Sequence, residues 1–112
     1  MKKIMLGIFS ILFLLTITGC GTEADPEFRV TNQRVDKANV QVKTSGGNTI
    51  NINDVIQGQL TDYQSTAEGT IIVTAVIQNE PITPTITFTA KKDKSYTIVV
   101  VTGNTPTLRI DQ

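Results

Sequence analysis

The fold of this chain is decided by residues 70–78, which read Thr70-Ile71-Ile72-Val73-Thr74-Ala75-Val76-Ile77-Gln78. Apolar residues occupy every second position of this stretch, at Ile71, Val73, Ala75 and Ile77. A period of two is that of a β-strand, in which successive side chains point to opposite faces. Thr, Val and Ile also suit a pleated, half-buried surface. The stretch is therefore predicted to be a strand with one face in a core.

The same alternation extends in both directions from this stretch. Further strands are expected over Phe28–Asn32, Asn39–Lys43, Asn48–Asn53, Gly58–Tyr63, Pro84–Ala90, Ser95–Thr102 and Thr107–Ile110. Residues 64–69 are expected to form a polar turn, and Gly46-Gly47 another. Seven or eight short strands without an amphipathic helix predict an all-β domain, a small antiparallel β-sandwich of immunoglobulin-like or transthyretin-like type. A small closed barrel is the alternative.

Some apolar residues fall on the side of their strands opposite to the expected core. They are Ile72, Val76, Val99 and Val101. Simple alternation would leave them in water. We therefore expect this part of a sheet to be covered by a loop or by a partner.

The first 19 residues follow a different pattern. Lys2 and Lys3 precede an uncharged apolar run, which is the layout of a secretory signal. A run of roughly 15 residues reaches about 22 Å as a helix, short of the ~30 Å hydrocarbon core of a bilayer, so a permanent span is disfavoured. The run ends in Ile17-Thr18-Gly19-Cys20, and Cys20 is the single cysteine. Small residues leading into a cysteine resemble the lipobox of bacterial lipoproteins.

The lipobox resemblance implies that Cys20 receives a diacylglyceryl group and becomes the N-terminus after cleavage between Gly19 and Cys20. Two acyl chains give a stable anchor, whereas one is marginal. We expect a lipoprotein signal peptide over residues 1–19, a lipidated N-terminus and tether over 20–27, and the sandwich over 28–112. Gly21 follows the cysteine. An aspartate at this position would resemble the signal that retains lipoproteins in the inner membrane, and this chain lacks it. The expected location is the outer membrane of a two-membrane cell, or otherwise the outer leaflet of the plasma membrane.

The composition excludes several kinds of chemistry. The chain has no His and no Trp, and its one cysteine is assigned to the lipid. A His-based triad, a cysteine nucleophile, a zinc site of His and Cys, and a disulfide framework therefore lack their atoms. Ten basic and ten acidic residues, without a basic cluster typical of such proteins, argue against nucleic acid as a partner. No cofactor and no metal are predicted.

Two groups of polar residues are weak candidates for chemistry. Asn51, Asn53 and Asp54 offer oxygen ligands to calcium, but the segment lacks a calcium-binding loop, so a strand-end role is favoured. The carboxylates that could form an acid and base pair are Asp62, Glu68 and Glu80, and nothing in the sequence brings two of them together.

Three further patterns have ordinary structural explanations. The alternating row Thr83, Thr85, Thr87 and Thr89 resembles an ice-binding surface but occupies one strand only, so solvent-facing threonine is favoured. The aromatic residues that follow the predicted signal are expected in the core. They are Phe28, Tyr63, Phe88 and Tyr96. Lys91, Lys92 and Lys94 are expected to form a solvated hairpin tip that discourages edge pairing.

The order of several short motifs resembles domain-of-unknown-function family 4397. These motifs are Phe-Arg-Val-Thr-Asn (28–32), Ala-Asn-Val-Gln-Val-Lys (38–43), Gly58 followed by Tyr63, Glu-Gly-Thr-Ile-Ile-Val-Thr-Ala-Val (68–76) and Lys-Ser-Tyr-Thr-Ile-Val-Val-Val-Thr-Gly (94–103). The chain departs from the family at residues 32–36, where members commonly show a His-Ala-Ser-Pro-Asp-like turn, and at Lys92-Asp93, where they show a glycine. The resemblance implies a bacterial extracytoplasmic β-sandwich, often on lipoproteins, without an established activity.

The sequence thus predicts a lipid-anchored, extracytoplasmic β-sandwich lipoprotein that is not an enzyme and serves the cell envelope as a binding or structural module. Its partners would be the membrane, through the lipid on Cys20, and an unidentified envelope protein or polymer. Two alternatives stay open. One is a hydrolase, or its accessory, acting on cell-wall or surface polymer; the other is a docked subunit of an envelope assembly, with Ile72, Val76, Val99 and Val101 as its contact face.

Overall fold

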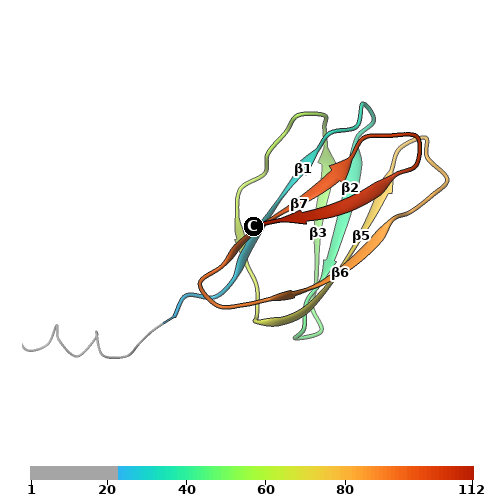
Figure 1. The fold of residues 1–112 in the computed structure, drawn as a ribbon. Coiled ribbons are helices and arrows are strands. Elements are labelled where there is room, and N and C mark those ends of the chain that lie inside the picture. Colours follow the sequence, from blue (N-terminus) through green and yellow to red (C-terminus); the bar gives the residue numbers. More distant parts are fainter. Residues whose placement is uncertain (1–22) are drawn as a thin grey trace, which may run out of the picture.

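The computed structural model describes residues 23–112, so the predicted signal, Gly19 and Cys20 lie outside the described residues. These residues form β1 (Glu27–Asn32), β2 (Ala38–Lys43), β3 (Thr49–Val55), β4 (Gln64–Ser65), β5 (Gly69–Ile77), β6 (Thr85–Ala90), β7 (Ser95–Val101) and β8 (Thr107–Asp111), as Figure 1 shows. No helix of this part of the chain is long and apolar enough to cross a membrane.

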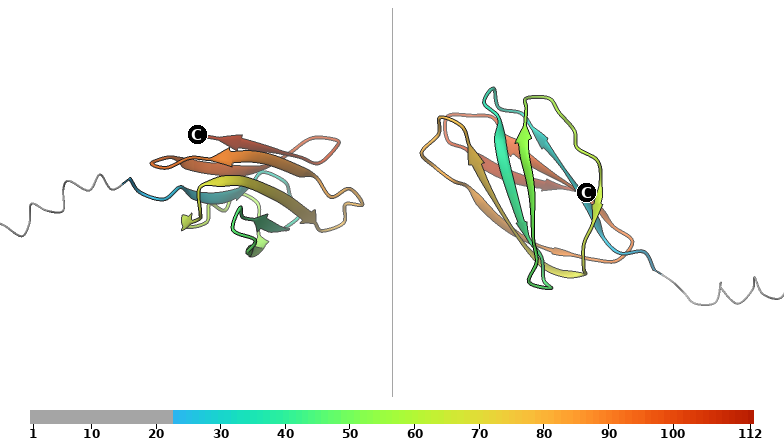
Figure 2. Two further views of the ribbon diagram at one scale, coloured as in Figure 1. Left: turned by 90° about the horizontal axis from the view of Figure 1, so that it is seen from below. Right: turned by 180° about the vertical axis from the view of Figure 1, so that it is seen from behind.

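The strands form two sheets that pack face to face, which confirms the predicted β-sandwich. One sheet, the front sheet, has the order β4-β1-β7-β8, and the other, the back sheet, has the order β3-β2-β5-β6. Figure 2 shows the two layers from below and from behind. In an immunoglobulin constant-type sandwich the first strand lies beside the second. Here β1 and β2 belong to different sheets, so the strand order is not that of the constant-type immunoglobulin sandwich.

One pairing departs from the antiparallel arrangement expected from the sequence. β1 and β7 run parallel, in a register that places Phe28 beside Tyr96 and Val30 beside Ile98. Parallel neighbours cannot be joined by a tight hairpin and need a long connection. That connection is the whole of β2 to β6, so the pair brings together residues nearly 70 positions apart, which alternation within single strands could not reveal.

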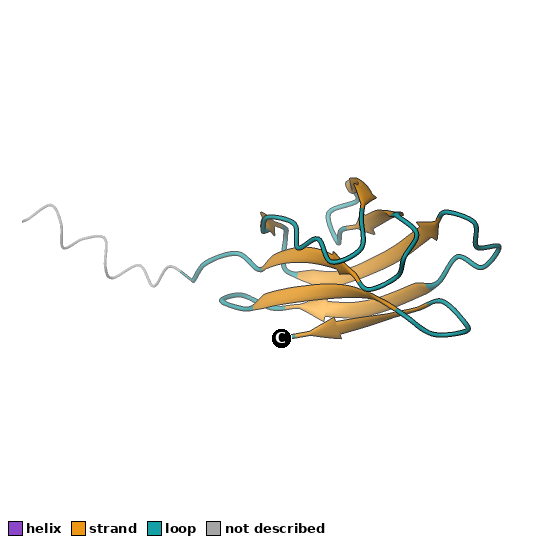
Figure 3. Cartoon of the chain, turned by 90° about the horizontal axis from the view of Figure 1, so that it is seen from above, coloured by secondary structure: helices purple, strands orange, loops and turns teal. Residues whose placement is uncertain are grey.

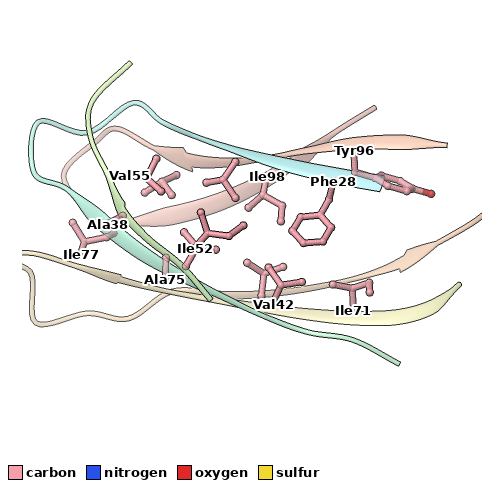
Figure 4. Packing of buried hydrophobic residues seen from close by; sticks show 14 of the residues in the cluster. Phe28, Ala38, Val42, Ile52, Val55, Ile71, Ala75, Ile77, Tyr96 and Ile98 are labelled. Carbon is pink, nitrogen blue, oxygen red and sulfur yellow. The ribbon is translucent and has the colours of Figure 1, made fainter. Parts of the chain in front are cut away.

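The core lies between the sheets and consists of the inward residue of each alternation, as Figure 4 shows. Its fully buried members include Val30, Val40, Val42, Val55, Ile71, Val73, Ala75, Ile98 and Val100. Phe88 and Tyr96 meet at the rim of this cluster with their ring centroids 4.9 Å apart. The strand faces predicted from the period of two are thus confirmed.

The strand predicted over Gly58–Tyr63 is wrong. The segment does run along the edge of β1, where Gly58 N donates to Asn32 O at 2.7 Å and Thr61 N to Val30 O at 2.9 Å. However, the Thr61 side chain accepts a hydrogen bond from Val30 N at 2.9 Å, which replaces a backbone ladder bond. Regular pairing is found only at Gln64–Ser65, inside the segment predicted to be a turn.

The apolar residues on the strand faces opposite to the core differ in their solvent exposure. Val99 is buried and Val101 is half-buried on the outer side of the front sheet. Ile72 and Val76 of β5 stay 38% and 51% exposed on the outer side of the back sheet. No segment of residues 23–112 covers these two side chains.

We expect the Val73→Asp substitution to unfold the domain or lower its free energy of unfolding by several kcal/mol, because it places an unpaired charge at a position with no solvent exposure. Thr107→Asp, at an exposed position of β8, is the matched control and should change stability by less than about 0.5 kcal/mol. Urea unfolding measures both variants, and a native-like Val73→Asp protein would contradict the strand register.

Candidate functional site

The two ends of the sandwich carry different features. Ala38 pairs with both Val55 and Ile77, and Asn32 pairs with Val100. The β1–β2, β5–β6 and β7–β8 loops and the start of the β3–β4 connection therefore share one end, which we call the distal end. The chain enters β1 at the opposite end, the tether end, beside the β6–β7 turn, as Figure 3 also shows.

At the tether end, the segment before β1 is held by the β6–β7 turn. Ala24 N donates to Asp93 Oδ1 at 2.8 Å, and Asp93 N donates to Ala24 O at 2.9 Å. Asp93 has a positive φ of 63°, a conformation that Asp tolerates better than most residues. Pro26 is buried, and its carbonyl oxygen accepts from Thr66 N at 3.0 Å. The part of the predicted tether from Ala24 onward is thus packed against the domain.

An ion pair reinforces this attachment. Lys92 Nζ lies 3.0 Å from Asp25 Oδ1. The pKa of Lys92 is raised above its ordinary value, first by this hydrogen bond and then by the charge of Asp25. Both side chains are exposed enough for solvent to screen the attraction, so the backbone contacts of Ala24 carry most of the attachment. One lysine of the predicted hairpin tip, Lys92, therefore contacts the N-terminal segment.

Shallow hollows flank Asp25 but bring no catalytic groups together. The larger has a volume of about 270 Å³ and is lined mainly by small and polar residues such as Thr44, Asn48, Ser65 and Thr66. Among residues 23–112, no group of three or more His, Cys, Asp or Glu side chains is placed to hold a metal ion.

At the distal end, Arg34 ties three loops together. Its Nη1 donates to the carbonyl oxygens of Val101 at 3.1 Å and Gly103 at 3.0 Å, and its Nη2 lies 2.8 Å from Glu80 Oε2. Arg34 belongs to the β1–β2 loop, Gly103 to the β7–β8 loop and Glu80 to the β5–β6 loop. The Arg34 side chain is only 11% exposed, and the rigid fork of its guanidinium thus fixes the three loops relative to one another.

A buried amide completes this bracing. Asn32 has no exposed surface, and its Nδ2 donates to Asp36 O at 2.8 Å and to Val55 O at 2.9 Å. Its Oδ1 accepts from Arg34 N at 2.9 Å. Both donations from the amide nitrogen and the bond to the amide oxygen thus link the β1–β2 loop to the end of β3. A buried polar group needs such partners.

Three apolar side chains project from the braced loops into solvent. Val35 is 79% exposed, Ile56 is 59% exposed and Ile82 is 47% exposed. They come from three different connections, β1–β2, β3–β4 and β5–β6. Arg34 pairs with Glu80 and Lys37 with Asp54, while the carboxylate of Asp36, next to Val35, accepts a hydrogen bond from Asn79 Nδ2 at 3.4 Å and forms no ion pair within residues 23–112. The distal end therefore presents apolar groups on a rigid frame with little free charge.

The structure separates the candidates that the sequence singled out. Glu80 lies at the distal end and Glu68 at the tether end, so these two carboxylates cannot form a catalytic pair. Asp54 lies at a register shift of the β2–β3 pair with a φ of 56°, in the strand-end role predicted for it. Asn51 and Asn53 project outward from β3.

The two tyrosines differ in their environments. Tyr96 is buried as predicted, and its hydroxyl accepts from Lys91 N at 3.0 Å. Tyr63 was expected in the core and is instead 40% exposed, with the Arg29 guanidinium 4.6 Å from its ring centroid. This prediction was wrong because Tyr63 lies in the irregular connection beside β1, where no inward position exists for it.

The threonine row is wider than the sequence indicated. Thr85, Thr87 and Thr89 project outward from β6, and Thr89 and Thr85 pair with Thr70 and Thr74 of β5. The row therefore extends over two neighbouring strands of the back sheet, which a single strand could not reveal.

Sequence reasoning also missed Arg34, Asn32 and Asp93. The run Asn32-Gln33-Arg34-Val35-Asp36 was noted only as a departure from a family pattern. Its polar residues act through contacts up to 69 positions away, which no local signal indicates.

Replacing Arg34 by Gln should lower the free energy of unfolding by roughly 2 kcal/mol, because two carbonyl oxygens and the partly buried Glu80 lose their donor. Lys37→Gln is the matched control, since it breaks the exposed pair with Asp54 and should cost less than about 0.5 kcal/mol. Urea unfolding compares them, and equal effects would contradict the bracing role.

Replacing Asp93 by Gly should release the N-terminal segment without straining the turn, because glycine accepts the positive φ. Amide exchange at Ala24 should become about three- to tenfold faster, as expected for the loss of one hydrogen bond. Asp93→Asn keeps an acceptor oxygen and should exchange like the parent chain. If all three proteins exchange at the same rate, the side chain does not hold the segment.

The comparisons with known proteins show the fold alone. No family model and no curated protein matches the chain. The resemblance to domain-of-unknown-function family 4397 thus stays a prediction. A solution NMR structure of a protein from Eubacterium rectale is similar to this structure, with a TM-score of 0.63 and 21% sequence identity. The match covers 83% of this chain and 93% of that one, so the similarity extends over the whole sandwich.

Proposed function

We propose that this chain is a lipid-anchored, extracytoplasmic β-sandwich lipoprotein that works as a non-catalytic binding module. It is attached to its membrane at the tether end and binds the apolar surface of a cell-envelope protein with its distal end. The observation that carries the binding role is the set of exposed apolar side chains, Val35, Ile56 and Ile82, on loops that Arg34 and Asn32 brace.

The anchor supports a definite orientation. Lipid on Cys20 leaves only Gly21, Thr22 and Glu23 before the segment that the β6–β7 turn holds from Ala24 onward. Four extended steps from Cys20 to Ala24 reach at most about 14 Å. The nine residues of β5 alone span about 30 Å. The tether end therefore stays near the headgroups, and the distal end points away from the membrane.

The distal end suits binding because its loops are already fixed. A loop that is ordered before association loses little conformational entropy when it binds, so more of the contact energy appears as affinity. Scattered apolar residues on a surface are ordinary, but here they occupy the braced loops at the end farthest from the anchor. With Arg34 and Lys37 both in ion pairs, the contact would be apolar and would depend weakly on ionic strength.

The location follows the same reasoning. An uncharged run after Lys2 and Lys3 and the small residues before Cys20 support export and lipidation. We place the domain on the extracytoplasmic side, on the outer membrane of a cell with two membranes or on the outer leaflet of the plasma membrane otherwise.

The test places a photoreactive amino acid at Val35 or Ile82 of the full-length chain in cells, with Asn48 of the exposed β2–β3 turn as the control position. Irradiation should give a discrete protein adduct from the two distal positions and not from Asn48. Val35→Asp should reduce the Ile82 adduct at least tenfold if one partner contacts both side chains, while raised salt should leave it unchanged.

Cys20→Ala, fractionated in parallel, should leave the membrane and lose lipid labelling. Lipid labelling that persists in this variant would contradict the anchor. Equal adducts at all three positions, or none at Val35 and Ile82, would contradict the distal binding role whatever the outcome for Cys20.

A further inference from the structure

The outer face of the back sheet is nearly free of charge. Its outward side chains are Asn39, Gln41 and Lys43 of β2, Thr49, Asn51 and Asn53 of β3, Thr70, Ile72, Thr74 and Val76 of β5, and Thr85, Thr87 and Thr89 of β6. Lys43 is charged, and so is Asp54, which is exposed at the distal end of β3 and pairs with Lys37 at 3.4 Å. We call these residues the neutral face; in the right-hand view of Figure 2 its strands β2 and β3 lie in front.

The opposite outer face shows that this neutrality is not general to the domain. The outward positions of the front sheet include Glu27, Arg29, Arg109 and Asp111, with an ion pair of 2.8 Å between the last two. A depletion of charge around apolar side chains is the compositional mark of the centre of a protein interface. On the neutral face, the apolar centre is formed by the exposed Ile72 and Val76 of the inner strand β5.

We propose that the neutral face is a dimer interface and that its partner is a second copy of this chain in the same membrane. This inference rests on the proposed lipid anchor. A two-fold contact sets a surface against itself, so a face dominated by one sign of charge would repel its copy. The neutral face meets no such penalty.

The register of the sheet gives the contact a definite form. Hydrogen-bonded rows across the strands are Thr87-Ile72-Lys43 and Thr85-Thr74-Gln41. A two-fold axis parallel to β5 sets each β5 against its copy and each β2 against the β6 of the other chain. Ile72 then meets Ile72, Thr74 meets Thr74, Gln41 meets Thr85, and Lys43 meets the hydroxyl of Thr87. Lys43 thus faces a neutral acceptor and not its own copy, and β3, which carries Asp54, has no strand of the copy opposite to it.

The anchor favours this axis over others. The strands run from the tether end to the distal end, so an axis parallel to β5 keeps both tether ends at one membrane. An axis perpendicular to the strands would carry one anchor to the far end, beyond the reach of about 14 Å. Both distal ends then point away from the membrane and stay free to bind.

The size of the face explains why the membrane matters. With the axis over β5, three strands of each copy face the other; at a spacing of about 4.8 Å and a length of about six residues, they cover roughly 290 Å² in projection. Two copies bury less than the roughly 1,200–2,000 Å² typical of stable complexes in free solution. Confinement of both chains to one membrane raises their effective concentration, which offsets the small area.

The test uses matched cysteine variants of the full-length chain in cells. Thr74→Cys lies on the inner strand β5 of the neutral face, and Thr97→Cys lies on the inner strand β7 of the opposite face; both positions are half-buried. The native Cys20 is blocked by lipid in the proposed mature protein. A short bismaleimide should convert Thr74→Cys to a species of twice the monomer mass at a yield at least tenfold above Thr97→Cys.

A charge variant separates a specific contact from crowding. Ile72→Lys at this exposed position places two like charges together across the axis and should lower the Thr74→Cys crosslink about tenfold, while Thr107→Lys on β8 should leave it unchanged. An unchanged melting temperature shows that Ile72→Lys still folds.

Equal crosslinking at both cysteine positions, no crosslinking at Thr74→Cys, or a product with a different protein would overturn the second copy as occupant. Membrane fractionation of the same samples reports on the anchor separately. A chain found outside the membrane fraction would contradict the proposed anchor, whereas a chain that stays in the membrane fraction without a Thr74→Cys crosslink would contradict the pairing alone.

Discussion

The parallel pairing of β1 with β7 is the constraint on which both ends of this molecule depend. Because the two strands run in the same direction, the start of β1 lies beside the start of β7, where Glu27 N donates to Lys94 O at 3.1 Å. The ends of the two strands also lie together, where Gln33 N donates to Val100 O at 2.9 Å. The first contact brings the N-terminal segment to the β6–β7 turn. The second brings Arg34 within reach of the β7–β8 loop.

The sequence allowed the strands and the core to be predicted because both follow from short-range alternation. Ile71, Val73 and Ile98 are buried as expected, since a period of two assigns each of them to one face whatever the strand order. Strand order is a property of contacts between distant residues, and alternation does not contain it. The parallel pair, the placement of Glu68 and Glu80 at opposite ends and the wide threonine row therefore appear only in the structure.

The errors have local physical causes. Gly58–Tyr63 has strand-like residues and lies along β1, but the Thr61 hydroxyl takes the backbone amide that a ladder would use. Tyr63 consequently leaves the core and lies under Arg29. The bracing residues were missed because Arg34 and Asn32 bind backbone carbonyl groups from other elements. Such bonds depend on where those elements end, which a linear pattern does not specify.

The proposed lipid anchor, the rigid distal loops and the neutral face would each lower the free-energy cost of association. Association from solution loses translational and rotational freedom, and flexible loops add a further ordering cost. Lipid on Cys20 would remove part of the first cost by limiting the height of the domain above the membrane, since the chain is held again from Ala24 onward. Arg34 lowers the second cost by fixing the distal loops before any partner arrives. With such an anchor, a small apolar contact such as that offered by Ile72 and Val76 would suffice where a free domain would need a larger one.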